Sequence, residues 1–306
     1  MYKNFYGLKR NPFEITPDPA FLFPTRRHNE ALAALYYGVR RHKGFVVMTG
    51  EVGTGKTLLV RCLLDLLNRS EVNYAYVYNT RLSTLEFLQY IAGDFHLSAA
   101  GKSKAELLLD LSSFVVKRYQ QKLSTVLIVD EAHHLEIAVL EEIRLLTNLE
   151  TSQQKLLQIL LVGQPELDQK LDCYELRQLK QRIAIRSNLG ALNAFETQGY
   201  IERRLELAGS NGRALLLFPP ATVQAIFEMS GGIPRLINTI CENALINAYA
   251  RKASSVPPEI IQEVASDLRL EKNSSPQPFN NRMENQDLWQ ATKTLLEFRQ
   301  FMKASQ

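Results

Sequence analysis

The segment Gly50-Glu-Val-Gly-Thr-Gly-Lys-Thr57 constrains the fold more than any other feature of the sequence. It matches the pattern G-x-x-x-x-G-K-[ST] without a mismatch, directly after the apolar run Phe45–Thr49 and before a helical pattern. Glycines at these spacings let backbone N–H groups turn toward phosphate oxygens, and the N-terminus of the following helix adds partial positive charge. The segment therefore predicts a strand–loop–helix unit that binds the phosphates of a nucleotide.

Two side chains of this phosphate-binding loop would carry chemistry. Lys56 would place a positive charge at the β- and γ-phosphates, and the Thr57 hydroxyl would be a ligand of Mg²⁺. A glycine-rich turn between a strand and a helix can also arise without a ligand, but the complete motif in its expected context favours the nucleotide site. The residues expected to contact the nucleotide here are Gly50, Glu51, Val52, Gly53, Thr54, Gly55, Lys56, Thr57 and Leu58.

A second motif, Thr125-Val-Leu-Ile-Val-Asp-Glu131, is an apolar strand that ends in two carboxylates. Asp130 would hold Mg²⁺ through water, and Glu131 would polarise the attacking water. The competing interpretation makes the pair an N-cap and a first-turn acid of the next helix. Together with an intact phosphate-binding loop, the acidic pair favours hydrolysis of ATP, since GTPases of the Ras type usually lack a carboxylate at the position of Glu131.

Apolar runs typical of buried strands alternate with helical patterns as far as about residue 188, and only helical patterns follow Leu192. This alternation predicts an α/β fold of the P-loop NTPase class, with a five-stranded parallel sheet and a small all-helical lid domain after it. The predicted strands are Phe45–Thr49, Tyr74–Tyr78, Thr125–Val129, Leu157–Val162 and Ile183–Leu189. The predicted lid helices are Phe195–Ala208, Pro219–Met229, Pro234–Ala250 and Pro258–Leu270.

The composition divides the chain into four stretches. Residues 1–27 contain four prolines and several aromatic residues, which predicts an arm without a long helix. The α/β domain is expected over 28–192 and the helical domain over 193–272. The last stretch, 273–306, opens with a run of Asn, Ser, Pro and Gln and is interpreted as a linker and tail, with an amphipathic segment over Glu284–Met302.

Charge and composition exclude several classes of protein. The formal net charge is +4, from 36 Lys and Arg against 32 Asp and Glu, which is too small by itself to indicate nucleic-acid binding. The three cysteines lack metal-ligand spacing and are expected as reduced core residues. No apolar run approaches the roughly 18 residues that a membrane span needs, and the N-terminus lacks the apolar segment of a secretory signal. We expect a cytoplasmic protein.

Asp130-Glu-Ala-His133 also spells a helicase signature, but the residues after Leu192 are too few for the second α/β core of such a helicase. His133 and His134 are then expected on the exposed start of a helix. The ordered motifs instead resemble the AAA+ ATPases, and within them the general secretion pathway protein A (ExeA-like) family, over residues 1 to about 270. They include Phe5-Tyr-Gly-Leu8, Asn11-Pro-Phe13, Gly50–Thr57, Asp130-Glu-Ala132, Leu161-Val-Gly-Gln-Pro-Glu-Leu167, Tyr200-Ile-Glu-Arg-Arg-Leu205 and Gly231-Gly-Ile-Pro-Arg-Leu-Ile-Asn238.

The resemblance implies two further residues at the nucleotide. Gln164, after the strand Leu157–Val162, would orient the lytic water from a strand that lies between the two phosphate-site strands. Arg235 would open a lid helix and reach the γ-phosphate. A first-turn arginine opposes the helix dipole, which makes a purely structural role for Arg235 less natural.

The resemblance also implies an arginine that acts on the ATP of a neighbouring subunit. Arg182, at the end of the helical segment Glu175–Arg182, is the first candidate and Arg177 the alternative, while a solvated basic face is the competing interpretation. Asn79 would couple the state of the nucleotide to Glu131, although an ordinary turn residue fits this position nearly as well.

Three functions share this site. The first is a motor or switch in envelope secretion or export assembly that uses ATP and Mg²⁺, forms a ring or helical oligomer and contacts secretion proteins. The second is an ATP-dependent, DNA-binding transposition helper of the TniB or Mu B type, for which weak duplex binding is expected at this net charge. The third is a nucleotide-binding protein with little turnover, which the presence of Lys56 and Glu131 disfavours. The first is favoured, without the peptidoglycan role of full-length secretion members.

Overall fold

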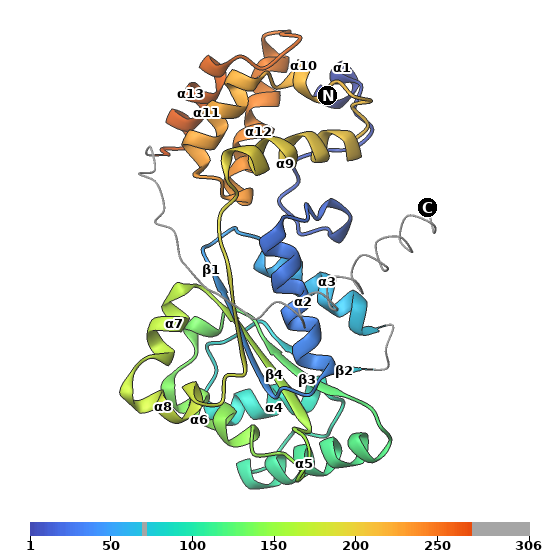
Figure 1. The fold of residues 1–306 in the computed structure, drawn as a ribbon, viewed down its shortest axis with the longest axis vertical. Helices are drawn as coiled ribbons and strands as arrows, with labels where there is room; N and C mark the ends of the chain where they lie inside the picture. Colours follow the sequence, from blue (N-terminus) through green and yellow to red (C-terminus); the bar gives the residue numbers. More distant parts are fainter. Residues whose placement is uncertain (69–71, 271–306) are drawn as a thin grey trace. The chain divides into compact units, whose positions relative to one another are not determined.

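The computed structural model describes residues 1–68 and 72–270, which form two compact units (Figure 1). The α/β unit comprises Arg26–Glu51 and Leu59–Leu189. The helical unit comprises Met1–Thr25, Val52–Leu58 and residues 190–270. The predicted linker and amphipathic tail, 273–306, lie outside the described residues.

The α/β unit is built on a sheet of five parallel strands in the order β2-β3-β4-β1-β5. The predicted α/β fold and its five-stranded parallel sheet are confirmed, with strand ends displaced by one or two residues. The strands are β1 Phe45–Gly50, β2 Asn73–Val77, β3 Thr125–Val129, β4 Leu157–Gly163 and β5 Ile185–Leu189.

Burial of the strands follows their place in the sheet. Every residue of β1, β3 and β4 is buried, whereas the edge strands β2 and β5 are only partly buried. Side chains of one face, Val47, Leu127 and Ile159 among them, pack with helices α4, α5 and α6 into one core. On the other face, α2 lies so close to β1 that a Cβ at Gly38 would stand 2.6 Å from Val46 Cγ2. Helices on both faces explain why the central strands are continuous apolar runs.

Three helices of the α/β unit begin at clear sequence signals. Helices α4 and α5 open with capping boxes, in which the Ser83 and Ser103 hydroxyls accept from the backbone N–H of the glutamate three residues later. Proline opens α7 at the first position, where no N–H is needed. The helices are α2 Arg26–Arg40, α3 Lys56–Asn68, α4 Thr84–Asp94, α5 Lys104–Gln120, α6 Ile137–Leu146, α7 Pro165–Leu171 and α8 Arg177–Lys180.

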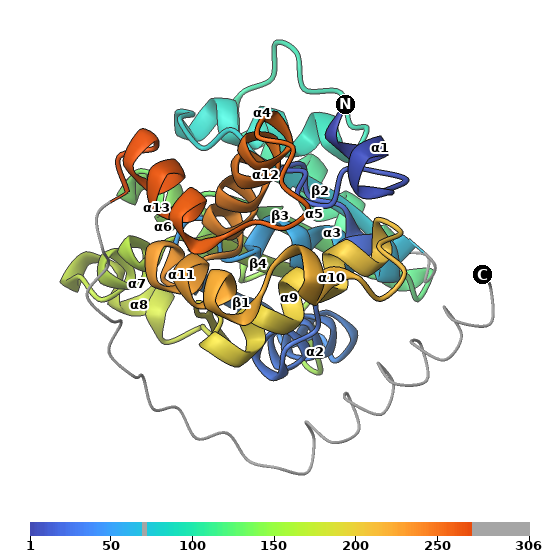
Figure 2. The same ribbon diagram turned by 90° about the horizontal axis from the view of Figure 1, so that it is seen from above.

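The helical unit contains the predicted lid helices and two short additional ones. Helices α11, α12 and α13 pack against one another, and α9 packs against α11 (Figure 2). No helix of the described chain is both long and apolar enough to cross a bilayer. The helices are α1 Tyr2–Tyr6, α9 Ala194–Leu207, α10 Ala214–Leu217, α11 Pro220–Ser230, α12 Pro234–Ala250 and α13 Pro258–Asp267.

The N-terminal arm is held to the helical unit by one buried arginine. Arg204 of α9 is 5% exposed; its guanidinium donates to the carbonyls of Pro12 at 2.6 Å and Glu14 at 3.1 Å. The same guanidinium lies 4.6 Å from the centre of the Phe21 ring. Phe13 is buried in the core of this unit. Before α2 begins at Arg26, the arm contains the short helix α1 and a 3₁₀ helix, Pro19–Phe21, and residues Met1–Thr25 form part of the helical unit.

Candidate nucleotide-binding site

The ends of three central strands define the first half of the site. Register pairs Thr49 of β1 with Gly163 of β4, and Val129 of β3 with Leu161 of β4. Because all strands are parallel, the residues that follow them emerge on the side of the sheet where the carboxyl-terminal ends of the strands lie. We call this side the carboxyl edge and the opposite side the amino edge. The prediction that β4 lies between β1 and β3 is confirmed. Open parallel sheets usually bind their ligands outside this edge.

The phosphate-binding loop has the backbone that its glycines predict. Gly53 and Gly55 have φ values of +82° and +101°, which L-residues with a Cβ rarely adopt. Thr54 and Lys56 are buried, and Lys56 is the first residue of α3. The loop therefore ends at the N-terminus of a long helix, where backbone N–H groups and the helix dipole favour an anion.

Arg235 lies directly against this loop. Its backbone N–H donates to the Gly53 carbonyl at 3.2 Å. A Cβ at Gly53 would stand 2.6 Å from the Arg235 Cβ and 3.1 Å from Ile233 Cγ2, so only glycine fits without displacement. Helix α12 begins at Pro234, which places Arg235 in its first turn as predicted. The structure thus brings Arg235 and the phosphate-binding loop together within one unit.

Asp130 is held by two neutral donors at the carboxyl edge. The Tyr76 hydroxyl donates to Asp130 Oδ2 at 2.8 Å, and the Glu131 backbone N–H donates to Oδ1 at 2.9 Å. Burial and, secondarily, the negative charge of Asp130 raise the pKa of Tyr76, so its hydroxyl keeps the proton that it donates. Asp130 itself is 4% exposed. The orientation of this carboxylate is therefore set by its neighbours.

Glu131 and Gln164 meet through His133. One oxygen of Glu131, Oε2, lies 3.4 Å from His133 Nδ1, and the Gln164 backbone N–H donates to the same nitrogen at 3.4 Å. Lys170 Nζ donates to the His133 carbonyl at 2.6 Å and fixes this turn. The expectation that both histidines are exposed is wrong for His133, whose side chain is 7% exposed; His134 is exposed. The cause is the 3₁₀ helix Ala132–His134, which turns His133 inward.

The residue after β2 that contacts Glu131 is Thr80. Its hydroxyl donates to the Glu131 carbonyl at 3.2 Å. Asn79 is exposed, and its Oδ1 accepts from the Arg81 backbone N–H at 3.3 Å, as in a turn. The coupling role of Asn79 stays a prediction. Thr80 and Tyr76 were not singled out from the sequence because only the pairing of β2 with β3 brings them to the acidic pair.

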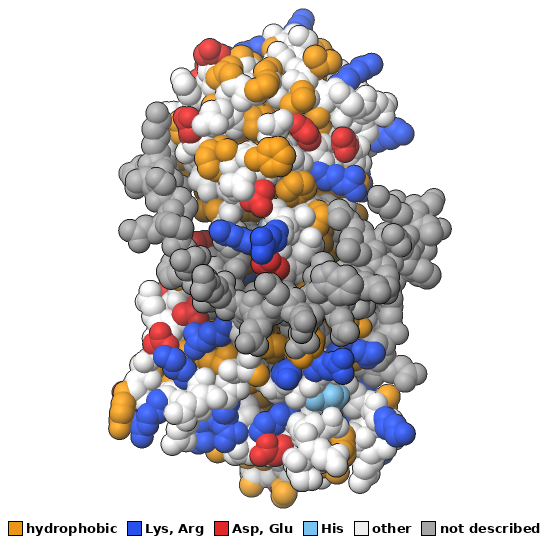
Figure 3. All heavy atoms as spheres, in the orientation of Figure 1, with side chains coloured by type: hydrophobic (Ala, Val, Ile, Leu, Met, Phe, Trp, Pro, Cys, Tyr) orange, Lys and Arg blue, Asp and Glu red, His pale blue; other side chains and the backbone are white. Residues whose placement is uncertain are grey.

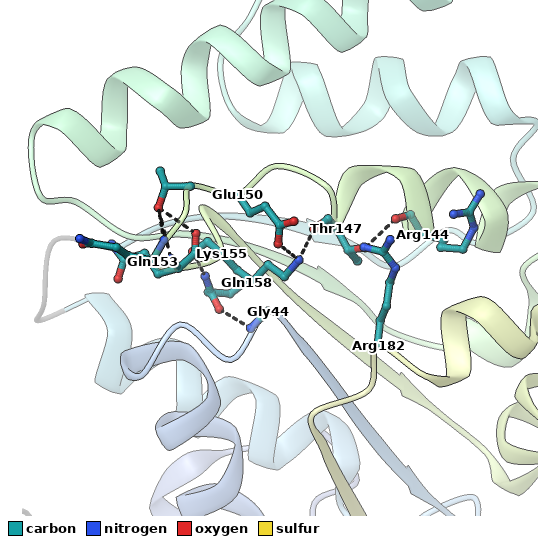
Figure 4. Close-up of polar contacts among 10 residues, drawn as sticks. Gly44, Arg144, Thr147, Glu150, Gln153, Lys155, Gln158 and Arg182 are labelled. Atoms are coloured by element: carbon teal, nitrogen blue, oxygen red, sulfur yellow. Dashed lines mark hydrogen bonds and ion pairs between the residues drawn. The ribbon is translucent and has the colours of Figure 1, made fainter.

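Arg182 lies at the opposite, amino edge of the same sheet (Figure 4). Its Nη1 donates to Thr147 Oγ1 at 2.7 Å, and this hydroxyl donates to the Arg144 carbonyl at 2.6 Å. The position follows from the chain, because Arg182 immediately precedes β5. Arg177 instead stacks on the exposed Tyr174 ring, 3.9 Å from its centre. The predicted roles of Arg182 and Arg177 stay predictions.

The residues at the candidate site fit Mg²⁺ and a nucleotide. Within residues 1–68 and 72–270, no group of three or more His, Cys, Asp and Glu side chains could hold a metal ion by itself. Mg²⁺ is usually bound through one or two carboxylates together with substrate phosphates and water. The chain offers oxygen donors of two kinds, the Asp130 carboxylate and the Thr57 hydroxyl. These oxygen donors fit Mg²⁺ that is bound together with the phosphates of a nucleotide.

Comparison with known proteins agrees with this geometry. A family model described as an AAA domain matches residues 39–171. The general secretion pathway protein A of Aeromonas hydrophila is 45% identical over 257 residues, which cover 84% of this chain and 46% of that protein. The chain thus spans about half the length of this relative.

Solved structures share the fold at low sequence identity. The ORC2 protein of Aeropyrum pernix, in ADPNP–ADP complexes, matches with a TM-score of 0.63 at 19% identity. The match covers 85% of this chain and 72% of the ORC2 chain. The ORC1 protein of Aeropyrum pernix, in complex with DNA, has a TM-score of 0.64 at 19% identity and covers 85% and 69%. Residues 39–171 thus match the AAA domain family, the fold is that of AAA+ proteins, and the sequence is similar to general secretion pathway protein A (ExeA-like).

Proposed function

We propose that this chain binds ATP with Mg²⁺, hydrolyses it and acts as a motor or switch in envelope secretion or export assembly. The observation that carries the proposal is the pair Asp130 and Glu131 at the end of β3, at the same sheet edge from which β1 enters the phosphate-binding loop. The 45% identity to a general secretion pathway protein supports the choice of pathway.

Each residue of the site has a distinct task in hydrolysis. Lys56 and the loop N–H groups bind the phosphates, while Thr57 and Asp130, the latter through water, would hold Mg²⁺. When bound, Mg²⁺ would neutralise charge on the phosphates. Glu131 accepts a proton from the attacking water, and Gln164, its neighbour across His133, orients that water. Arg235 contacts the γ-phosphate from the start of α12.

An arginine from a second copy would complete the site. Charge that develops on the transferred phosphoryl group needs a positive donor, and Arg182 lies at the amino edge, away from the Asp130 and Glu131 of its own sheet. Head-to-tail contacts, which form closed rings or open helical arrays, present such a residue to the next copy. The chain therefore self-associates into a ring or helical oligomer and works with secretion or export proteins in the cytoplasm.

The DNA-binding alternative has less support. On the face drawn in Figure 3, Lys and Arg side chains are frequent over the α/β unit. Several basic side chains of this unit are paired with carboxylates, however, as in Lys180–Asp172 and Arg186–Asp168, with N–O distances of 2.7 and 2.8 Å. Such pairs reduce the charge available to phosphates of a nucleic acid, since binding depends on released counterions.

Two substitutions separate binding from hydrolysis. Lys56→Ala should weaken ATP binding itself, because it removes the charge at the phosphates. Glu131→Gln should bind ATP normally and lose about 10²- to 10⁴-fold in turnover, because only the group that accepts the proton is changed. Binding is measured with a fluorescent ATP analogue and turnover by phosphate release. Unchanged turnover in Glu131→Gln would refute the proposed hydrolytic site.

A further inference from the structure

Two tyrosines of the edge strand β2, Tyr74 and Tyr76, lie on one face of the sheet, and Tyr78 directly follows the strand. Tyr74, Tyr76 and Tyr78 follow one another at every second position, the spacing that places side chains on the same side of a strand. Tyr78 is 66% exposed, and its ring packs edge-on against Tyr90 at a centroid distance of 6.0 Å. Tyr76 differs from Tyr78 because it is only partly exposed and its hydroxyl reaches Asp130 at 2.8 Å.

The backbone of Tyr76 is fixed on both sides. Toward the sheet interior, register places Tyr76 opposite Ile128, two residues before Asp130. On the side of β2 that faces away from β3, the Tyr76 N–H donates to Oδ2 of Asp94, the last residue of α4, at 2.6 Å. With its backbone held between β3 and α4, the hydroxyl of Tyr76 has a defined position relative to the Asp130 carboxylate.

We propose that Tyr76 is a positioning residue that orients Asp130 for Mg²⁺; this inference rests on the proposed function. The Tyr76 hydroxyl fixes Oδ2 while the Glu131 N–H fixes Oδ1, so the carboxylate plane is set from both oxygens. An ionised carboxylate can accept about four hydrogen bonds, so these two donors do not exclude a water that Asp130 would share with the metal. Partners that orient a metal-binding carboxylate affect metal affinity even though they do not touch the metal.

The hydroxyl can be removed with little other change. Tyr76→Phe keeps the ring, its packing and the backbone bond to Asp94, and it leaves Asp130 with one orienting donor fewer. Loss of such a partner typically reduces metal affinity by about 10- to 100-fold. Because Asp130 acts through water, we expect about a tenfold rise in the Mg²⁺ concentration needed for half-maximal effect. Tyr78→Phe, at the residue that directly follows the same strand, is the matched control.

The test is a Mg²⁺ titration of nucleotide binding that needs no turnover. Binding of a fluorescent ATP analogue to the full chain is followed against MgCl₂ for the unchanged protein, Tyr76→Phe, Tyr78→Phe and Asp130→Asn. We expect the midpoint to rise in Tyr76→Phe and Asp130→Asn, to stay constant in Tyr78→Phe, and nucleotide affinity in EDTA to be equal for all four. Tyr76→Leu should shift the midpoint no further than Tyr76→Phe, since the hydroxyl carries the effect.

Two results would overturn the inference in different ways. If Asp130→Asn shifts the midpoint and Tyr76→Phe does not, Tyr76 does not orient the carboxylate, and the proposed function stands. If neither variant shifts the midpoint, Asp130 has no role toward Mg²⁺, and this part of the proposed function fails as well. Thermal unfolding of each variant, compared with Tyr78→Phe, excludes a loss of fold as the cause of a shift.

Discussion

The two edges of the sheet use polar side chains in opposite ways. At the carboxyl edge, the acidic Asp130 accepts hydrogen bonds from neutral donors, the Tyr76 hydroxyl and a backbone N–H. At the amino edge, basic side chains are bound into the frame, as where Lys155 pairs with Glu150 and donates to the Thr147 carbonyl at 3.1 Å (Figure 4). The two edges thus differ in these partners of their charged groups: Asp130 accepts from neutral donors, while Lys155 pairs with a carboxylate.

At the amino edge, Arg182 differs from Lys155 in its hydrogen-bond partner. Lys155 pairs with the Glu150 carboxylate, and Gln158 Oε1 accepts from the Gly44 backbone N–H at 2.8 Å. Both contacts connect neighbouring segments of the α/β unit. Arg182 donates to the neutral Thr147 hydroxyl, and its charge, behind the larger effect of Lys155, helps to lower the pKa of the nearby Glu150 carboxyl. A guanidinium has several N–H donors, so the bond to Thr147 leaves others for an anion from another chain.

The largest expected effect is a loss of turnover on substitution of Arg182 at the amino edge. Arg182→Ala should retain ATP binding and lose about 10³- to 10⁵-fold in turnover, the range for arginines supplied in trans. Arg177→Ala is the matched control, because Arg177 is a nearby arginine that stacks on Tyr174 instead. Both are measured as phosphate release at saturating ATP. If Arg177→Ala loses activity and Arg182→Ala does not, the two assignments must be exchanged.

A smaller effect, on stability and not on ATP binding, is expected for a substitution of Gly44 at the same edge. Gly44 has a φ of +86°, and a Cβ there would stand 2.7 Å from Lys155 Cγ. Gly44→Ala should therefore lower the free energy of unfolding by about 1–3 kcal/mol, measured by urea denaturation, while ATP binding is retained. Gly93→Ala, at an exposed position of α4 with open space around it, should raise stability by about 0.5–1 kcal/mol. Equal stability in the two variants would contradict this view of Gly44.

The sequence predicted what depends on local pattern. Strand and helix alternation identified the parallel sheet, and the motifs around Lys56 and Asp130 identified the residues expected at the site. These signals are readable because periodicity and turn chemistry act over a few residues. The order of the strands, with β4 between β1 and β3, followed only from the resemblance to a known family.

What the sequence missed depends on contacts between distant segments. Tyr76 and Thr80 gain their partners through the pairing of β2 with β3, which periodicity does not specify. His133 is buried because a 3₁₀ turn, fixed by Lys170, separates it from the exposed His134. In the sequence, Arg204 is indistinguishable from an exposed charged residue of a helix. In the structure it binds the N-terminal arm, donating to the carbonyl of Pro12, which is 192 residues away in the chain.

The most direct test mixes two inactive variants. An Arg182→Ala chain keeps Glu131, and a Glu131→Gln chain keeps Arg182, so a mixed contact can join an intact carboxyl edge to an intact arginine. If the two edges act on one nucleotide from neighbouring copies, phosphate release by the mixture should exceed the sum of the two variants alone and should rise with protein concentration. Activity of the mixture equal to that sum, at every concentration, would contradict an arginine supplied in trans.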